Sequence, residues 1–373
     1  MDELEHDYPA EATVEQEDGL EAVETPVDLD ADGLKHLRID IRRALPGRRL
    51  DKYLSGRLGK SYSRTALQRY IREGMVTVDG KAVKPSYIIR TSDVIDMLLP
   101  EIKAPEIPPE PIPLDIVYED DDVLAVNKQA DLIVHPARGN WTGTLVNALA
   151  YYLKTDWRDI GDLPTVGPVF RPGIVHRLDR NTTGVMLVAK SQLALWRLGR
   201  QFELRSIHKV YNAIVHGCVS HDEDVINAPI GRDPRAREKR CVYRGKQPYP
   251  ASVKDAMTKY RVIQRIGPRP AGKVAFTLLE LELMTGRTHQ LRVHLSLIGH
   301  PIVGDPMYGS GPLHRGQITG DAEDFGGSLI TRQALHARLI EFNHPRTNVR
   351  ITVEAPWPED FAATLDQLQR TLG

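Results

Sequence analysis

The sequence predicts an α+β protein made of a small N-terminal domain and a larger second domain. Three observations lead to this prediction. The length of 373 residues fits two domains, or one large domain with an appendage. Residues 100–113 contain six prolines, which favours a semi-rigid linker over a packed element. Beyond this linker, short β-rich runs occur together with amphipathic helical stretches, as is typical of a mixed fold built around an extended sheet.

The chain begins with an acidic segment. Residues 1–34 hold thirteen Asp or Glu and no Lys or Arg, and this composition predicts a disordered tail. Competition with a polyanionic ligand for a basic surface and simple solubilisation are two roles for such a tail, and we prefer the second. The rest of the chain has 37 acidic and 49 basic residues, although the whole chain has a net charge of −1. This excess of about +12 fits a polyanionic partner, whereas bases paired with surface acids are the alternative.

Residues 35–99 are expected to form the small domain, which opens on two helices. Leu50, Leu54 and Leu58 recur every four residues and therefore fall on one face of a helix. A second amphipathic segment begins at Ser63. Its basic residues recur at near-helical spacing and are candidate phosphate contacts, although a plain solvated helix carries similar charges: Arg64, Arg69 and Arg72.

The remainder of the small domain is predicted to be β-structure. Residues 75–78 and 81–83 are expected to be strands, joined through Asp79-Gly80 in a type I′ turn. A last short strand is expected over residues 93–98. In this order of elements the segment resembles the S4 RNA-binding domain. The resemblance implies that the domain binds RNA.

Residues 114–373 are expected to form the larger domain, with one clear helix and four strands. The helix covers residues 192–204 and places Leu195, Leu198 and Phe202 on one side. The predicted strands are rich in β-branched residues and cover residues 123–126, 185–189, 210–215 and 275–284.

One polar segment precedes the second of these strands, Arg171-Pro-Gly-Ile-Val-His-Arg-Leu-Asp-Arg-Asn-Thr-Thr-Gly184. Within it, Asp179 lies between Arg177 and Arg180, and both arginines are expected to keep the carboxylate ionised. An ionised carboxylate can act as a nucleophile or can stabilise a cationic sugar carbon. Taken alone, however, an aspartate of this kind is more often a surface ion pair or a turn cap.

Residues 176–184, His-Arg-Leu-Asp-Arg-Asn-Thr-Thr-Gly, resemble the active-site motif of the pseudouridine synthases of the RluA type. That family usually ends the motif with Thr-Ser-Gly, and the threonine found here keeps the hydroxyl. Further segments resemble the family in the expected order, spread over nearly all of residues 114–357. They are residues 121–128, 134–136, 209–213, 286–294, 304–309, 332–337 and 342–345.

The resemblance implies both a fold and a reaction. The fold is a mainly antiparallel central sheet flanked by helices, with the active-site cleft across it. The reaction converts uridine in RNA to pseudouridine: it cleaves the N1 glycosidic bond, turns the uracil and rejoins it through C5. Asp179 is the candidate catalytic carboxylate, acting on a flipped or single-stranded uridine. The sequence does not decide whether it attacks C1′, attacks C6 or assists a glycal route.

The resemblance also implies roles for four other residues. Arg177 is expected to fill or steer around the position that the uridine vacates. Arg292, on a predicted helix, is expected to pair with Asp179 and orient it. Tyr211 offers a ring that stacks on uracil and a hydroxyl that can assist proton removal from C5, although a buried tyrosine is more often core packing. Lys209 belongs to the same strand motif and is a candidate substrate contact.

We expect no metal ion and no organic cofactor. The histidines lack a convincing ligand set with carboxylates or thiols, and neither a dinucleotide-binding nor a Walker motif occurs. Cys218 and Cys241 lack metal-ligand spacing and fit reduced thiols of a cytosolic protein. The sequence has neither a membrane-spanning apolar run nor a secretory signal. We therefore expect a cytoplasmic monomer with RNA as its partner, without a membrane or an obligate protein partner.

Two questions about function stay open at this point. The S4-like domain favours large-subunit ribosomal RNA as the substrate over transfer RNA, but closely similar catalytic domains act on both. A noncatalytic RNA-binding or ribosome-assembly protein is the alternative to an enzyme. The intact set of Asp179, Tyr211 and Arg292 argues against it. A hydrolytic N-glycosidase would need a positioned water and a second acid or base, for which no motif stands out.

Overall fold

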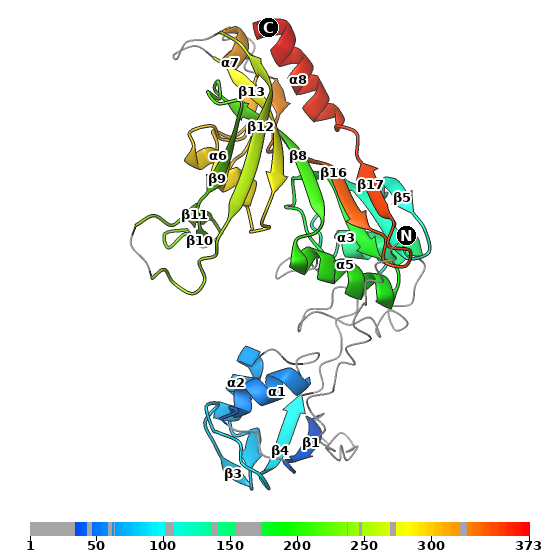
Figure 1. Cartoon of the computed structure of the whole chain (residues 1–373), viewed down its shortest axis with the longest axis vertical. Helices are drawn as coiled ribbons and strands as arrows, with labels where there is room; N and C mark the ends of the chain where they lie inside the picture. The colour runs from blue at the N-terminus through cyan, green and yellow to red at the C-terminus, as the bar shows by residue number, and fades with distance from the viewer. Residues whose placement is uncertain are drawn as a thin grey trace, which may run out of the picture. The chain divides into compact units, whose positions relative to one another are not determined.

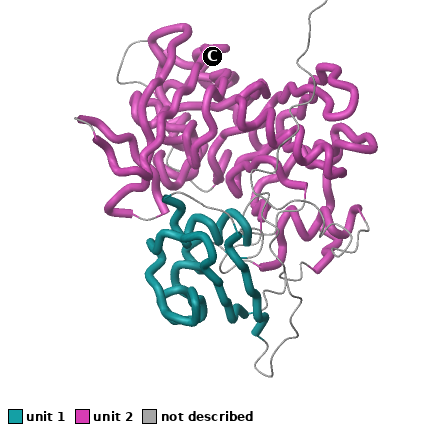
Figure 2. The backbone as a smooth tube through the Cα atoms, turned by 60° about the horizontal axis from the view of Figure 1, so that its bottom comes forward, with its two compact units in different colours: residues 1–105, 165–170 teal, residues 106–164, 171–373 magenta. Residues whose placement is uncertain are grey.

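The structure is a computed structural model of the chain (Figure 1). It describes residues 34–42, 47–58, 62, 64–100, 108–135, 141–153, 173–236, 238–245, 248–268, 274–320 and 327–373. These residues divide into two compact units, one within residues 34–100 and one within residues 108–373 (Figure 2). The acidic tail is predicted to be disordered over residues 1–34. Its residues 1–33 lie outside the described residues, as does the linker segment 101–107, whereas Leu34 belongs to a strand, contrary to the prediction.

The first unit combines a four-stranded antiparallel sheet with two helices, α1 (Leu50–Leu58) and α2 (Arg64–Arg72). Asp79 and Gly80 have φ values of 50° and 71°, as both central residues of a type I′ turn require, so the predicted hairpin is confirmed. The unit has its own apolar core, in which residues of both helices pack against the sheet. In sheet order the strands are β1 (Leu34–Asp40), β4 (Val94–Pro100), β2 (Val76–Val78) and β3 (Lys81–Ala82).

Both ends of this unit differ from the prediction. The sequence pattern does not predict β1, because only Ile39 of its residues is buried; the strand forms by pairing with β4 along its full length. Pro100, which the sequence assigns to the linker, is the last residue of β4. The later part of the linker is also held in place, since the side-chain amide of Asn147 donates to the Pro108 carbonyl at 2.9 Å and Glu110 accepts from the Gly143 N–H at 3.0 Å.

The second unit is built on a nine-stranded sheet. All of its strand pairings are antiparallel except β7–β16, which is parallel, so the predicted mainly antiparallel sheet is confirmed. In sheet order the strands are β5 (Ile116–Glu119), β6 (Val123–Lys128), β7 (Thr183–Ala189), β16 (Leu335–Asn343), β8 (His208–His216), β13 (Phe276–Leu283), β12 (Met257–Ile266) and β9 (Glu223–Asn227), with β17 (Arg350–Glu354) paired to β16.

The four strands predicted in this unit are found as β6, β7, β8 and β13, and the predicted helix is α5 (Gln192–Leu204). Helix α5 begins after Ser191, whose side chain accepts the Ala194 N–H, and ends at Arg205 in the left-handed region. Its apolar side contacts β7 and β16 through a core that includes Leu187, Leu195 and Phe342. The helix and these two strands support the segment that carries Asp179.

A glycine allows the parallel strands β7 and β16 to approach each other closely. Gly184 has a φ of 111°, and a Cβ atom there would lie 2.2 Å from the Ala337 carbonyl oxygen. Next to it, the Thr183 hydroxyl lies 2.9 Å from Nδ1 of the buried His336. This contact uses the hydroxyl that the sequence motif retains, so the Thr-Thr-Gly ending joins the Asp179 segment to the centre of the sheet.

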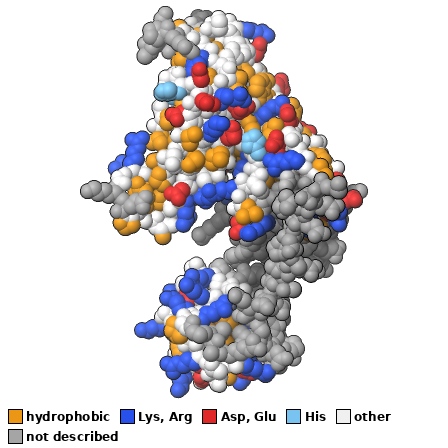
Figure 3. Space-filling view, in the orientation of Figure 1, with side chains coloured by type: hydrophobic (Ala, Val, Ile, Leu, Met, Phe, Trp, Pro, Cys, Tyr) orange, Lys and Arg blue, Asp and Glu red, His pale blue; other side chains and the backbone are white. Residues whose placement is uncertain are grey.

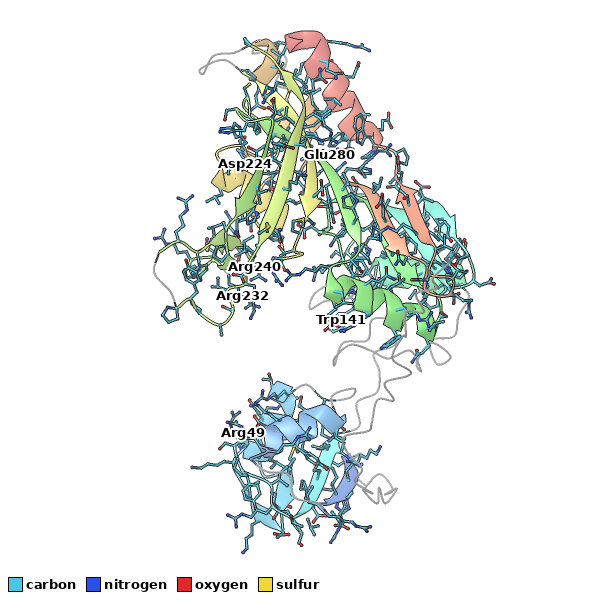
Figure 4. All side chains as sticks on the ribbon, in the orientation of Figure 1. Arg49, Trp141, Asp224, Arg232, Arg240 and Glu280 are labelled. Carbon is cyan, nitrogen blue, oxygen red and sulfur yellow. The ribbon has the colours of Figure 1, made fainter. Side chains whose placement is uncertain are left out.

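The remaining elements surround the large sheet. Helix α8, the red helix at the C-terminus in Figure 1, packs against β12 and β15. Arg232 and Arg240, labelled in Figure 4, are opposite each other in the β10–β11 pair. No helix within the described ranges is long and apolar enough to cross a membrane. The elements that surround the large sheet are α3 (Leu145–Leu153), α6 (Gln290–Leu297), α7 (Gly316–Thr319), α8 (Glu359–Leu372), β10 (Ile230–Arg232), β11 (Arg240–Val242), β14 (Leu313–His314) and β15 (Ser328–Ile330).

Candidate active site

A cavity of about 450 Å³ brings together every site residue that the sequence predicts in the second unit. Its wall comes from the segment before β7, the end of α5, the start of β8, the end of β13 and helix α6. We call it the central pocket. The predicted residues on its wall are Arg177, Asp179, Lys209, Tyr211 and Arg292.

Two contacts attach the Asp179 segment to the sheet. Nε2 of His176 accepts the Leu187 N–H of β7 at 2.8 Å, and the His176 ring stacks on Phe202 of α5 with ring centroids 4.6 Å apart. Burial lowers the pKa of His176 to about 3, which keeps the ring neutral and Nε2 able to accept. Beyond Asp179 the chain turns, and the Thr182 N–H donates to the Asp179 carbonyl at 3.1 Å.

Lys128, at the end of β6, also holds the Asp179 segment in place. Its buried Nζ donates to the carbonyl oxygens of Gln129, Leu132 and Arg180 at 2.8, 3.0 and 2.9 Å. Burial lowers the pKa of Lys128 to about 7, and the three acceptors together use all three hydrogens of the protonated amine. The sequence shows this lysine only as part of the 121–128 motif, without a role.

The ion pair predicted between Asp179 and Arg292 is present: Nη1 of Arg292 lies 3.2 Å from Oδ2 of Asp179. The other side of the guanidinium is held by Asp305, which accepts from Nε at 2.6 Å and from Nη2 at 2.8 Å. Asp305 is fully buried and also accepts the N–H groups of Met307 and Tyr308. Asp305 therefore fixes Arg292 so that only one edge of the guanidinium faces Asp179.

The two arginines beside Asp179 in the sequence do not hold it, contrary to the expectation. Nε of Arg180 lies 2.6 Å from Oδ1 of Asp131, on an exposed part of the surface. Arg177 forms no ion pair with any described residue and lines the central pocket. Neighbours in a loop often point in different directions, and the cation that pairs with Asp179 comes instead from α6.

His289 is a further group near Asp179. Its backbone is in the left-handed region with a φ of 58°, and its Nε2 lies 3.9 Å from Oδ2 of Asp179. Nδ1 lies 2.9 Å from the Tyr308 hydroxyl, which accepts the Arg240 N–H at 2.7 Å. If the hydroxyl donates to Nδ1, a neutral His289 carries its proton on Nε2, toward Asp179. Burial lowers the pKa of His289, which favours that neutral ring.

Lys209 and Tyr211 are two residues apart on β8, and both line the central pocket. Tyr211 is 6% exposed, and burial, together with the charge of Asp179, raises the pKa of its phenol. A protonated phenol is a weak base at neutral pH, but it can donate or accept a hydrogen bond. Nζ of Lys209 lies 5.5 Å from the centroid of the Phe202 ring, and burial lowers the pKa of this lysine.

Comparisons with known proteins identify the family. The family model described as RNA pseudouridylate synthase matches residues 122–297, which include most of the central pocket. Over 322 residues the chain is 42% identical to the "Uncharacterized RNA pseudouridine synthase YlyB" of Bacillus subtilis, covering 86% of this chain and 94% of that protein. The chain belongs to the RNA pseudouridylate synthase family.

Other members of the RNA pseudouridylate synthase family agree with this assignment. The "Ribosomal large subunit pseudouridine synthase D" of Pseudomonas aeruginosa is 39% identical over 330 residues, covering 87% of this chain and 93% of that protein. The solved structure of "Human RNA Pseudouridylate Synthase Domain Containing 4" has a TM-score of 0.51 at 25% identity and covers 68% of this chain and 92% of that one. The family and the fold class expected from the sequence are confirmed.

The S4 domain model matches residues 48–95 of this family member, so the predicted S4 resemblance is also confirmed. Of the arginines named as phosphate contacts, Arg64 is committed to the buried Asp51, with Nη2 2.8 Å from its Oδ2. Arg69 and Arg72 are exposed, and Arg69 lies over the Tyr70 ring. Residues 35–99 contain fifteen Lys or Arg and six Asp or Glu, so the domain is basic.

Proposed function

We propose that this protein converts specific uridines of RNA to pseudouridine, and that its substrate is large-subunit ribosomal RNA. The observation that carries the proposal is the carboxylate of Asp179 on the wall of the central pocket, oriented by a guanidinium whose other edge is anchored. Membership of the RNA pseudouridylate synthase family supports the reaction. The name of the Pseudomonas aeruginosa relative and the S4 match support the choice of RNA.

Asp179 is the group that we propose acts on the sugar or the base. Its Oδ2 faces Arg292, whereas Oδ1 makes no hydrogen bond with any described residue and can approach the substrate. Because Asp305 accepts two of the N–H groups of Arg292, the guanidinium holds Asp179 in place without covering both of its oxygens. The cavity volume of about 450 Å³ is in the range of small-molecule sites, so it accommodates a flipped nucleoside.

The other residues of the central pocket then have positioning roles in our proposal. The ring of Tyr211 stacks on the uracil, and its protonated hydroxyl donates to or accepts from the base rather than acting as a phenolate. Arg177 occupies or steers around the position that the uridine leaves. Lys209, a cation near the end of α5, contacts the substrate backbone.

We further propose that the S4 domain contributes RNA affinity through phosphate contacts. Arg69 and Arg72 are its exposed cations on α2, and Arg64 contributes through the part of its side chain that Asp51 leaves accessible. On the face drawn in Figure 3, Lys and Arg side chains are spread over each unit, with apolar side chains among them. A cytoplasmic location and action as a monomer, without a cofactor or an obligate protein partner, are also part of the proposal. Sedimentation of the purified protein tests the oligomeric state.

The decisive test is Asp179→Asn, which removes the charge with little change in volume. The substrate is large-subunit ribosomal RNA from a strain that lacks the gene, and pseudouridine is mapped along it after incubation. We expect the variant to fold and bind RNA but to lose isomerisation, because the remaining amide is neither a nucleophile nor an anion. Asp131→Asn is the matched control, since Asp131 pairs with Arg180 outside the central pocket and its loss should leave turnover intact.

Three outcomes would overturn parts of the proposal. Turnover near the wild-type rate in folded Asp179→Asn protein would remove Asp179 from the chemistry. Release of free uracil instead of pseudouridine would indicate a hydrolytic N-glycosidase. Modification of transfer RNA alone, with unchanged ribosomal RNA in the deletion strain, would refute the choice of substrate.

A further inference from the structure

A second cavity of about 430 Å³ lies directly beside the central pocket. The two cavities share four wall residues, Arg205, Leu283, Met284 and Thr285, so they are parts of one continuous recess. The wall of the second cavity comes from the end of α5, the start of β8, the end of β9, the start of β12 and the end of β13. We call it the flanking pocket. None of the roles proposed above uses it.

The wall of the flanking pocket combines apolar side chains with polar groups that have no partner of their own. Met257, Leu283 and Met284 supply the apolar surface, and Met284 is 49% exposed. The side chains of Asn227 and Asp255 are exposed and form no hydrogen bond or ion pair within the described ranges. Polarizable thioethers beside unpaired hydrogen-bonding groups suit a flat ring with polar edges.

The two acids on this wall disfavour a phosphate in the flanking pocket itself. Asp255 adds an exposed carboxylate to the wall, and its backbone carbonyl accepts from Nε of Arg287 at 3.0 Å. Glu282 adds a second acid, whose Oε2 lies 3.3 Å from Nε2 of His208 and whose Oε1 lies 3.6 Å from Nζ of Lys259. A phosphate placed there would meet like charge. An amino group on a base edge would meet acceptors instead.

Arg205 provides the cation that the backbone of a bound strand needs. It ends α5 with φ 59° and ψ 31°, it is exposed, and it forms no ion pair with a described residue. Its place on the wall of both cavities puts it on the boundary between them. Lys209 lines the central pocket as well, so both cations border it. A phosphate that links two nucleosides, one in each pocket, would lie against Arg205.

We infer that the flanking pocket binds the nucleobase next to the target uridine, and that it prefers a base with an exocyclic amino group. Asp255 and Asn227 accept from that amino group, and Met284 packs on the face of the ring. Uracil lacks an exocyclic amino group and offers the Asp255 carboxylate and the Asn227 side chain only its N3–H. The flanking pocket would thus help to select the uridine to be modified. This inference rests on the proposed RNA isomerisation.

The test couples changes in the protein to changes in the RNA. The substrate is a short RNA that spans the mapped uridine, prepared intact and with an abasic site on its 5′ or its 3′ side. Asp255→Ala and Met284→Ala should each lower kcat/KM on the intact RNA by about tenfold, because the first removes a charged acceptor for the base edge and the second removes apolar contact with the face of the ring. On the RNA that lacks the recognised base, Asp255→Ala should match the wild type, and Met284→Ala should lose less than on the intact RNA, since Met284 also lines the central pocket. Ile263→Ala is the control, because Ile263 is 48% exposed on β12 and lies outside both cavities.

Equal losses on intact and abasic RNA, or no loss on either, would overturn the inference. A purine, cytosine or uracil at the recognised position then tests base choice, and equal rates for all of them would refute the preference for an amino group. The affinity of each protein variant for each RNA is measured in parallel. If the wild type makes no pseudouridine, the proposed function fails, whereas the coupling between the flanking pocket and the neighbouring base can still be read from the affinities.

Arg205→Gln separates the phosphate contact from the base contact. It should lower the salt dependence of binding by the equivalent of one phosphate, a slope change of about 0.7 for single-stranded RNA. Its effect should persist on the abasic RNA, because removal of a base leaves the phosphate in place. An unchanged salt slope would remove Arg205 from the strand path.

Discussion

At the scale of single residues, one guanidinium serves two carboxylates in different ways. Asp305 is buried and takes two hydrogen bonds from Arg292, whereas Asp179 takes one and keeps an oxygen for the substrate. The geometry of this arrangement depends on the planar fork of arginine, whose five N–H donors have fixed directions. An ammonium group could satisfy one of the two acids but not both in the same geometry.

Substitution of Arg292 should therefore impair turnover even when the charge is kept. Arg292→Ala should lower the single-turnover rate by about 100-fold or more, as is usual when a preorganised electrostatic contact is removed. Arg292→Lys should rescue only part of that loss. Rapid-quench measurements on protein with a verified thermal transition provide the test, because Arg292→Ala also leaves Asp305 buried and unpaired. Arg261→Ala removes an exposed pair with Glu280 and is the control; full activity of both Arg292 variants would contradict the assignment.

Neutral histidines make stability depend on pH. Burial lowers the pKa of His176 to about 3 and that of His336 to about 4, and the ordinary value is 6.5. Between these values the unfolded chain binds protons that the folded chain does not, so the free energy of unfolding should fall as pH is lowered from 6.5 toward 4. The contribution is complete above pH 6.5, and its slope is about 1.4 kcal/mol per pH unit for each histidine.

Urea unfolding at a series of pH values measures this slope. His336→Gln should reduce it by the equivalent of about one proton between pH 6.5 and 4.5, because that side chain is fully buried between Thr183 and the Ala355 carbonyl in the folded state. The same slope in the wild type and the variant would show that His336 does not titrate on unfolding.

At the scale of elements, the parallel contact of β7 with β16 positions the Asp179 segment, and it depends on Gly184. Gly184→Ala should destabilise the protein by several kcal/mol, since the new methyl would overlap the Ala337 backbone and the positive φ disfavours any Cβ. Gly199→Ala is the matched control, because nothing lies within 4 Å of a Cβ in that position of α5. It should stabilise the protein by about 0.5–1 kcal/mol through helix propensity. Chemical denaturation measures the change in the free energy of unfolding for both variants, and the two changes should have opposite signs.

At the scale of the whole molecule, the S4 domain and the catalytic domain have separate cores. Removal of residues 1–99 should weaken RNA affinity and make its salt dependence shallower, because fewer counterions are released. It should damage the chemical step less, since every residue of the central pocket lies beyond residue 114. A short RNA should still be modified slowly at high enzyme concentration. Binding slopes against salt and single-turnover rates, for full-length and truncated protein, measure the two effects separately.

Deletion of residues 1–33 alone is the control for that truncation, because it removes acidic charge and leaves the S4 domain intact. An unchanged salt slope combined with loss of the chemical step would mean that the S4 domain completes the active site. That outcome would refute the division of labour between the two domains.

Local sequence determined much of the architecture. Helix α5, the β2–β3 hairpin and strands β6, β7, β8 and β13 follow from apolar periodicity and turn residues, since these signals act over a few neighbours in the chain. The ordered motifs likewise determined the family, and they indicated Asp179, Tyr211 and Arg292 as residues of one site.

Only the tertiary structure decided which groups meet. Asp305 is remote from Asp179 in the sequence, and its hold on Arg292 appears in no local pattern. Likewise, Arg180 adjoins Asp179 in the chain but pairs with Asp131 in space. The positions of Lys128 against the Asp179 segment and of Arg205 between the two pockets result from the packing of several strands and helices. Periodicity records which face of an element is buried, whereas the partner of a polar side chain depends on how distant segments pack, and no local pattern specifies that.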